Sequence, residues 1–284
     1  MWLHALAECP NNAEVFYHSC KFLVAQEKSS AIAPLFRGFI LSLCEDQQSE
    51  KKPVEVLRHI LGFPTEELLR GLIIKELQEQ LSQQMPYLHL IHCRWQWLHG
   101  SVEDTVDAFE RGLGTAMQLD ELHKLWMDYL VFSSSQQTRC QSKLFSDLVH
   151  RCLSTVPSRL EVPFNPAEFW SCYSFHNKVV TLYLSCLPQS QHALVLERLR
   201  YAMPNNTELG LRLLHQEWKD GNIEHLKFQV QMLSSQAPKC LAYWEILIAV
   251  ATELKEPSEV RHLYQQALHH LPLCAALWKQ SLAV

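Results

Sequence analysis

Glycine is scarce in this chain, with 8 among 284 residues, where average usage of about 7% predicts roughly 20. Phosphate-binding loops depend on glycine, and neither GxGxxG nor GxxxxGK occurs in the sequence. The common dinucleotide and P-loop sites are therefore excluded. A chain so poor in glycine and rich in Leu, Gln, Glu and Ala has few turns and strands, which predicts an all-α protein.

Other signals are absent as well. No run approaches the 18 or so apolar residues that a bilayer span needs, and no secretory signal pattern is visible. The ten cysteines are scattered without a CxxC pair, which argues against a disulfide scaffold and indicates a reducing compartment, the cytosol or the nucleus. Net charge is −5, which disfavours a nucleic-acid coat. With 48% apolar and 19% charged residues, the chain has a globular composition.

The spacing of the prolines indicates an internal repeat. Pro204, Pro238 and Pro272 are each 34 residues apart, and Trp244 and Trp278 each follow a proline by six residues. Proline lacks an N–H and fixes φ, so it ends one helix or opens the next. A 34-residue interval that holds two helical stretches predicts a helix–turn–helix repeat.

A six-residue phrase precedes these prolines. It has two apolar positions, then two mostly polar ones, then an often small residue where helices approach closely. Copies end four residues before a proline at 1–6, 148–153, 195–200, 229–234 and 263–268, and 108–113 is a copy without its proline. The fifth position is small in Ala5, Gly112, Cys152 and Ala267, whereas Leu199 and Leu233 predict wider junctions.

The expected helix starts repeat too. Ser101 and Asn222 each follow a glycine and precede a helix at the same offset, and Asn is a strong N-cap. PNNAE at 10–14 recurs as PNNTE at 204–208, so Asn11 and Asn205, each with a Glu three residues later, predict starts like a capping box.

These signals predict an all-α, right-handed α-solenoid of antiparallel helix pairs. The array has an N-terminal part at 1–156, a Pro-rich junction at 157–166 and C-terminal repeats at 167–284, within one continuous solenoid. The junction holds three prolines in ten residues, and the expected tryptophan is displaced there to Trp170. The expected helices are 1–9, 12–27, 31–44, 53–61, 65–83, 86–99, 101–117, 120–133, 138–155, 166–187, 190–203, 206–219, 222–235, 240–254, 257–270 and 273–283.

The repeat resembles a known family. Trp126-Met127-Asp128-Tyr129, with Phe109-Glu110-Arg111 upstream, resembles the half-a-TPR (HAT) repeat, whose first helix carries W-x-x-Y and whose second reads roughly Y-E-R-A-L before a proline. The resemblance covers residues 1–20 and 86–284 well and 21–85 poorly. It implies a scaffold of RNA processing, and TPR repeats share the same architecture.

The chain is also similar to the C-terminal repeat region of the large nuclear CCCH zinc-finger proteins of the poly(A)-tail exosome-targeting connection. This resemblance implies a nuclear scaffold that links polyadenylated transcripts to the exosome-associated helicase. The zinc finger itself is absent from these residues.

Residues that could carry chemistry have a simpler explanation as structural residues. His89, His92 and Cys93 would share one helix face and could ligate zinc, but no second ligand pair with zinc spacing exists, so we expect no metal and no cofactor. No nucleophile motif is present, so we expect no enzyme. The tryptophans could stack on bases, but few basic residues lie near them, so we expect them to pack between helices and expect no strong nucleic-acid binding.

Two surfaces are candidates for protein contacts. Residues 65–84 form an amphipathic stripe that includes Leu69 and Ile73, expected mainly as core and otherwise as a partner face. The chain opens inside a repeat and stops within a first helix, which predicts a fragment with apolar ends, Leu277 and Trp278 being the expected contact.

Expected partners are RNA-processing or decay factors, or a second copy in a homodimer. No membrane is expected. The alternatives are an RNA-binding helical array and a helical enzyme with an unrecognised site.

Overall fold

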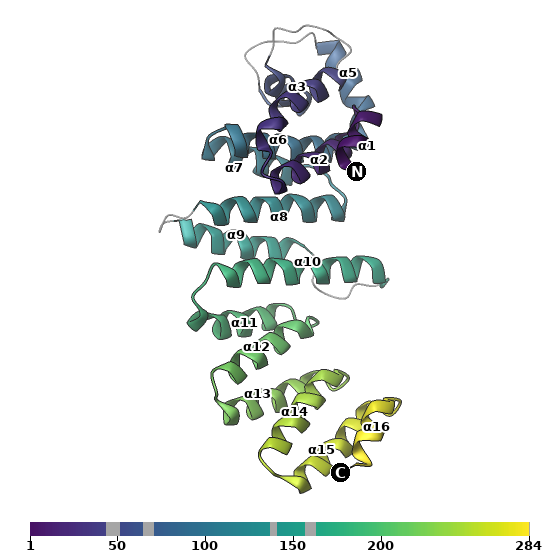
Figure 1. Cartoon of the computed structure of the whole chain (residues 1–284), viewed down its shortest axis with the longest axis vertical. Helices are drawn as coiled ribbons and strands as arrows, with labels where there is room; N and C mark the ends of the chain where they lie inside the picture. The colour runs from purple at the N-terminus through teal and green to yellow at the C-terminus, as the bar shows by residue number, and fades with distance from the viewer. Residues whose placement is uncertain (44–51, 65–70, 137–140, 157–162, 284) are drawn as a thin grey trace. The chain divides into compact units, whose positions relative to one another are not determined.

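The structure, a computed structural model, describes residues 1–43, 52–64, 71–136, 141–156 and 163–283, with the backbone alone for residues 71–74, 141 and 142. All regular secondary structure in these ranges is helical, without a strand (Figure 1). The all-α prediction is confirmed. The chain divides into two compact units, Met1–Ser142 and Lys143–Val284.

The N-terminal unit contains eight α-helices and two short 3₁₀ turns in its described part. They are α1 (Trp2–Glu8), α2 (Ala13–Ala25), η1 (Ser29–Ala31), α3 (Ile32–Leu43), α4 (Pro53–Ile60), α5 (Gly71–Gln80), η2 (Ser82–Gln84), α6 (Met85–His99), α7 (Val102–Leu113) and α8 (Leu119–Ser135). The helix expected over 65–83 ends at Gln80 and is followed by the 3₁₀ turn, and its residues 65–70 lie outside the described ranges.

The C-terminal unit contains eight further α-helices, counted over its described residues. They are α9 (Gln141–Thr155, whose first two residues precede the unit boundary), α10 (Pro166–Ser185), α11 (His192–Ala202), α12 (Thr207–Lys219), α13 (Ile223–Gln236), α14 (Leu241–Glu253), α15 (Pro257–His270) and α16 (Ala275–Ser281), with η3 (Gln189–Gln191) before α11. Each helix lies at an expected position. The Pro-rich junction remains a prediction, since residues 157–162 are not among those described.

The helix ends before the prolines share one geometry. The residues that precede Pro10, Pro204, Pro238 and Pro272 have φ between −126° and −128° and ψ between 58° and 70°. Each donates its N–H to the carbonyl four residues earlier, at 2.8 to 2.9 Å. A proline bars the preceding residue from the α region, so these four copies of the phrase end their helices in the same way.

The tryptophans six residues after the prolines also act alike. The indole Nε1 of Trp244 donates to the Pro238 carbonyl and that of Trp278 to the Pro272 carbonyl, both at 2.8 Å. The same position after Pro204 holds Gly210. Without a side chain there, Tyr243 of the following repeat reaches the backbone and donates its hydroxyl to the Thr207 carbonyl at 2.9 Å.

Helix starts follow the expectation in part. Ser101 accepts from the Asp104 N–H, and Asn222 accepts from the His225 N–H, as expected. The cap of α2 is Asn12 rather than Asn11.

The cap of α12 also differs from the prediction. Its position is taken by Asn206 rather than Asn205, and the Asn206 side chain donates instead to Asn177 of α10 at 2.8 Å. The capping box predicted at these two starts is wrong. At α2 the cap is one residue later than predicted, and at α12 the asparagine side chain bonds another helix instead of the helix start.

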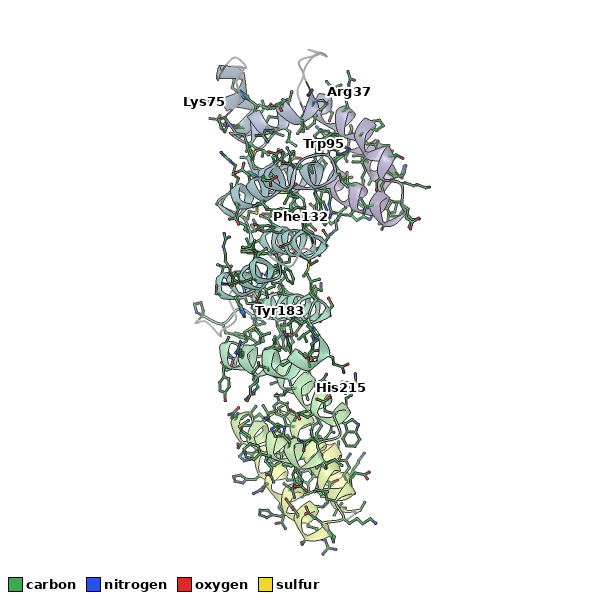
Figure 2. All side chains as sticks on the ribbon, turned by 90° about the vertical axis from the view of Figure 1, so that its left-hand side faces the viewer. Arg37, Lys75, Trp95, Phe132, Tyr183 and His215 are labelled. Carbon is green, nitrogen blue, oxygen red and sulfur yellow. The ribbon has the colours of Figure 1, made fainter. Side chains whose placement is uncertain are left out.

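Within the C-terminal unit, helices meet their chain neighbours and also the next helix but one. Arg200 of α11 donates to Gln236 of α13, and Tyr243 of α14 bonds the first residue of α12. Lys227 of α13 pairs with Glu259 of α15 at 3.0 Å. Inside the unit, Tyr183 of α10 is buried and hydrogen-bonds Ser146 of α9 (Figure 2).

In the N-terminal unit, the small residue of the phrase allows close packing. A Cβ atom at Gly112 of α7 would lie 3.1 Å from Leu125 Cδ2 of α8. Buried Phe109 stacks on Tyr129 at a centroid distance of 4.7 Å. The Tyr17 hydroxyl of α2 donates to Asp128 of α8 at 2.7 Å, and Arg94 of α6 contacts the same carboxylate at 3.4 Å.

Gly210→Ala is expected to destabilise the C-terminal unit by about 1–3 kcal/mol, the usual cost of a crowded core and a lost buried hydrogen bond. The new Cβ would lie 2.1 Å from the Tyr243 hydroxyl oxygen, so the ring must move and its bond to Thr207 breaks. The better helix propensity of alanine offsets about 1 kcal/mol of this cost.

Urea unfolding measures the change in the free energy of unfolding. Tyr243→Phe removes the crowded hydroxyl, so the cost of Gly210→Ala must shrink in that background. An equal cost in both backgrounds would contradict the contact.

Candidate protein-interaction site

The α16 residues expected at a contact lie in different environments. Leu277 is fully buried and belongs to the core of the C-terminal unit, so the expectation that it lies on the surface is wrong. It occupies the repeat position of Tyr243 and Leu209, both of which are buried. Trp278 is 49% exposed, as expected, and Leu282, four residues later, is also exposed. A partner role for either residue remains a prediction.

The stripe at 65–84 cannot be assessed at its two named positions. Leu69 lies outside the described residues, and so does the side chain of Ile73. Farther along, Leu81 is buried, as the core interpretation of the stripe expects.

His89, His92 and Cys93 share the buried face of α6. Burial lowers the pKa of His89 to about 4 and that of His92 to about 3, and it raises the pKa of the Cys93 thiol well above its ordinary value. Gln96 contacts His92 Nε2 at 3.2 Å, and Phe63 packs edge-on against its ring. No group of three or more His, Cys, Asp or Glu residues in the described ranges could hold a metal ion.

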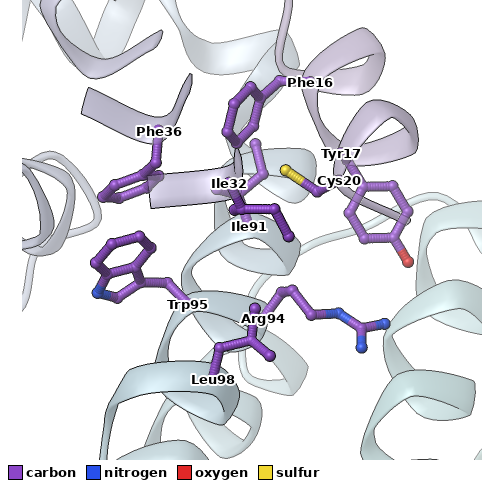
Figure 3. Close-up of a pocket in the computed structure, with 9 residues that line it drawn as sticks. All are labelled: Phe16, Tyr17, Cys20, Ile32, Phe36, Ile91, Arg94, Trp95 and Leu98. Carbon is purple, nitrogen blue, oxygen red and sulfur yellow. The ribbon is translucent and has the colours of Figure 1, made fainter. Parts of the chain in front are cut away.

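A small cavity lies between α2, α3 and α6 (Figure 3). Its walls are mostly apolar, with Phe36 stacked on Trp95 at 4.1 Å. Figure 3 shows the Arg94 guanidinium directed away from these two rings, toward the side where Tyr17 lies. Burial raises the pKa of the lining Cys20 thiol to about 12, so it is no nucleophile at neutral pH. The space suits about one water molecule, which is far less than a cofactor needs.

The tryptophans divide into packed and exposed groups. Trp126 and Trp244 are buried, which confirms the expected packing role for these two. Trp170 is 60% exposed, so the packing prediction is wrong there. The tryptophan that is displaced from its expected repeat position near the Pro-rich junction, Trp170, therefore lies on the surface.

Trp170 belongs to a set of exposed and half-buried rings that we call the α10 aromatic cluster: Phe164, Phe169, Trp170 and Tyr173. Trp170 lies 5.2 Å from Phe169 and 5.4 Å from Tyr173, edge to face in both pairs, and Phe164 lies 5.7 Å from Phe169, measured between ring centroids. Phe164 and Trp170 are exposed, whereas Phe169 and Tyr173 are half-buried. Clustered rings at the surface are typical of protein contact sites.

Local sequence fixes the helix that carries the cluster. Asn165 caps α10 by accepting from the N–H groups of Ala167 and Glu168, and Pro166 takes the first helical position. At 20 residues α10 exceeds both α9, with 15, and α11, with 11. In Figure 1 its N-terminal half extends past the ends of these neighbours. The rings on this half therefore remain uncovered by the two adjacent helices.

The cluster combines four aromatic rings with little charge. Residues 163–174 contain one acidic side chain, Glu168, and no lysine, arginine or histidine. Four rings supply a large apolar area at low cost in side-chain entropy, which suits an apolar side chain of a partner. Sequence reasoning identified Trp170 as displaced but did not predict its exposure, because the displacement alone does not show how far α10 outruns its neighbours. Among the described helices, none is long and apolar enough to cross a membrane.

Comparison with known proteins gives a partial assignment. No family model matches the chain. The chain is similar to the human zinc finger C3H1 domain-containing protein, with 43% identity over 289 aligned residues. The match covers 99% of this chain but 14% of the human protein, so the chain spans about one seventh of that relative. The chain is thus a homologue of one segment of a much larger zinc finger C3H1 domain-containing protein.

Proposed function

We propose that the chain is a non-catalytic scaffold that binds proteins, in nuclear RNA processing or exosome-targeted RNA decay. Its partners are RNA-processing or decay factors, which dock on the surface of a helical-repeat array. The α10 aromatic cluster is the observation that carries the proposal. The rings sit at the surface of a well-capped helix, whereas Trp126 and Trp244 are buried.

The repeat geometry supports an array of HAT-type helix pairs. Four helix ends share one backbone conformation before a proline, and two tryptophans make the same bond to a proline carbonyl. Bonds between every second helix, such as Arg200 to Gln236, fit a solenoid in which each repeat contacts its neighbours. Solenoids present extended surfaces, and such surfaces suit protein binding.

The similarity to a C3H1 zinc-finger protein supports the placement in RNA metabolism. The nuclear location and the link to the exosome come from the resemblance of the repeats to the family of such scaffolds. RNA as the direct ligand is disfavoured at the cluster, because base-stacking sites combine rings with cations and residues 163–174 hold none.

Affinity capture tests the proposal. The immobilised chain, incubated with nuclear extract, is expected to retain a defined set of proteins. Trp170→Ser is expected to lose at least one of them because it removes the most exposed ring of the cluster. Trp218→Ser is the matched control, since Trp218 is similarly exposed in the same unit but has no ring neighbour among the described contacts. Ribonuclease treatment must leave the captured set intact. Equal capture by both variants and the parent chain, or loss on ribonuclease treatment, would contradict a direct protein site at the cluster.

A further inference from the structure

Arg200, near the end of α11, is a buried cation without an acidic partner. The residue is 7% exposed, and no carboxylate in the described part of the chain forms an ion pair with it. Its Nη1 donates to Gln236 Oε1 at 2.7 Å, but Nε and Nη2 have no hydrogen-bond partner. These two atoms form one edge of the guanidinium, the edge that grips a carboxylate with two parallel bonds.

The repeat register shows that packing does not require an arginine here. Arg200 is the sixth residue of the repeated phrase, and four of the five other copies have leucine: Leu6, Leu113, Leu153 and Leu268. The remaining copy has Ser234. Where the position is buried, as in Leu6 and Leu153, an apolar side chain fills it. Arginine therefore replaces a residue that the fold accommodates more easily.

A buried charge that lacks a partner opposes folding, because it loses its hydration without gaining an ion pair. Two unpaired donors on the same guanidinium add to this cost. An anion that binds to the free edge removes both penalties at once.

Two exposed side chains contact the guanidinium. Gln236 is exposed, and so is Tyr201, whose ring centroid lies 5.0 Å from Arg200 Cζ. Arg200 also lies close enough to the Tyr243 hydroxyl to lower its pKa, opposing the larger effect of burial, while Tyr173 and Glu208 act on the same hydroxyl to raise it. Asn177, one turn after Tyr173 on α10, accepts a hydrogen bond from Asn206, and the next residue, Thr207, accepts the Tyr243 hydroxyl. The α10 helix that carries the cluster therefore lies close to Tyr243.

We propose that Arg200 is a recognition residue for a carboxylate in an acidic protein segment, which binds the free Nε–Nη2 edge while an adjacent apolar side chain packs on the α10 aromatic cluster. This inference rests on the proposed scaffold function and specifies the partner: a peptide with an aspartate or glutamate close to an aromatic or aliphatic residue. Binding displaces the Gln236 side chain from Nη1 or leaves it in place beside the carboxylate.

The test uses the full chain and an array of short fluorescent peptides that each contain one tryptophan or phenylalanine near two acidic residues. A second array carries the corresponding amides, asparagine and glutamine. We expect acidic peptides to bind and their amide counterparts to bind about 10- to 100-fold more weakly, the range for hydrogen bonds to a charged group. Arg200→Leu is expected to weaken acidic-peptide binding by the same factor.

Thermal unfolding separates recognition from a structural role. Since Arg200→Leu installs the residue of the other repeats, it is expected to keep or raise the melting temperature while binding is lost. Arg198→Leu is the matched control: it removes the same charge from an exposed position two residues away and is expected to leave peptide affinity within a factor of about 2.

Three results would overturn the inference: equal affinity for acidic and amide peptides, unchanged affinity in Arg200→Leu, or a lower melting temperature in that variant. Arg200-dependent binding of poly(A) RNA without binding of acidic peptides would overturn it as well. In each case the scaffold function stands if extract proteins are still captured through Trp170, and it fails separately if they are not.

Discussion

Trp126→Ala is expected to lower the free energy of unfolding of the N-terminal unit by about 3–5 kcal/mol, the range for deleting a buried aromatic side chain. Trp126 is 2% exposed and is among the largest fully buried side chains. Its ring packs near Tyr129, which in turn stacks on Phe109 of α7. Alanine would leave a cavity beside Tyr129 in the core of the unit.

Urea unfolding followed by circular dichroism measures the loss. Because the chain has two compact units, two transitions are expected if the units unfold separately, and Trp126→Ala must shift the one that belongs to the N-terminal unit. Trp218→Ala, at an exposed position of the other unit, is the control and is expected to change stability by less than about 0.5 kcal/mol. An unchanged midpoint in Trp126→Ala together with a lost partner would show that the tryptophan binds rather than packs.

The helices could be predicted well from sequence because their ends are punctuated locally. Proline fixes the residue before it, and this single steric rule produced the same turn after α1, α11, α13 and α15. The small fifth residue of the phrase, as at Gly112, likewise marked a close approach between helices. Such signals act within a few residues, so sequence spacing is enough to detect them.

The interaction surface could be predicted only in part, because exposure depends on contacts distant in sequence. Leu277 and Trp278 are adjacent and both apolar, yet one is core and the other half-exposed, since neighbouring positions on a helix face different directions. Trp170 is exposed because α10 is longer than the helices beside it. The role of Gly210 could not be predicted from sequence, because it depends on Tyr243 of the following repeat, which occupies the space beside Gly210.

Lowering the pH from 7 to 5 is expected to destabilise the N-terminal unit by about 2 kcal/mol for each of His89 and His92. Burial lowers the pKa of His89 to about 4 and that of His92 to about 3, and Arg58 adds to the shift of His92. In the unfolded chain both titrate near pH 6.5. Between pH 6.5 and 4 the unfolded state therefore binds more protons than the folded state, so stability falls as the pH falls through this window.

The hydrogen-bond geometry at His92 gives the same direction. The Gln96 amide nitrogen, a donor, faces His92 Nε2 at 3.2 Å, so a proton on Nε2 would face another donor instead of an acceptor. His92 Nδ1 has no hydrogen-bond partner among the described residues. His92→Leu removes the titrating group and is expected to reduce the stability difference between pH 7 and pH 5 by about 2 kcal/mol, whatever its effect at pH 7. His4→Leu is the control at an exposed position and must leave the difference unchanged. Urea midpoints at the two pH values decide the matter: if His92→Leu keeps the full difference, His92 is not held neutral by its surroundings, and the acid sensitivity of the unit has another source.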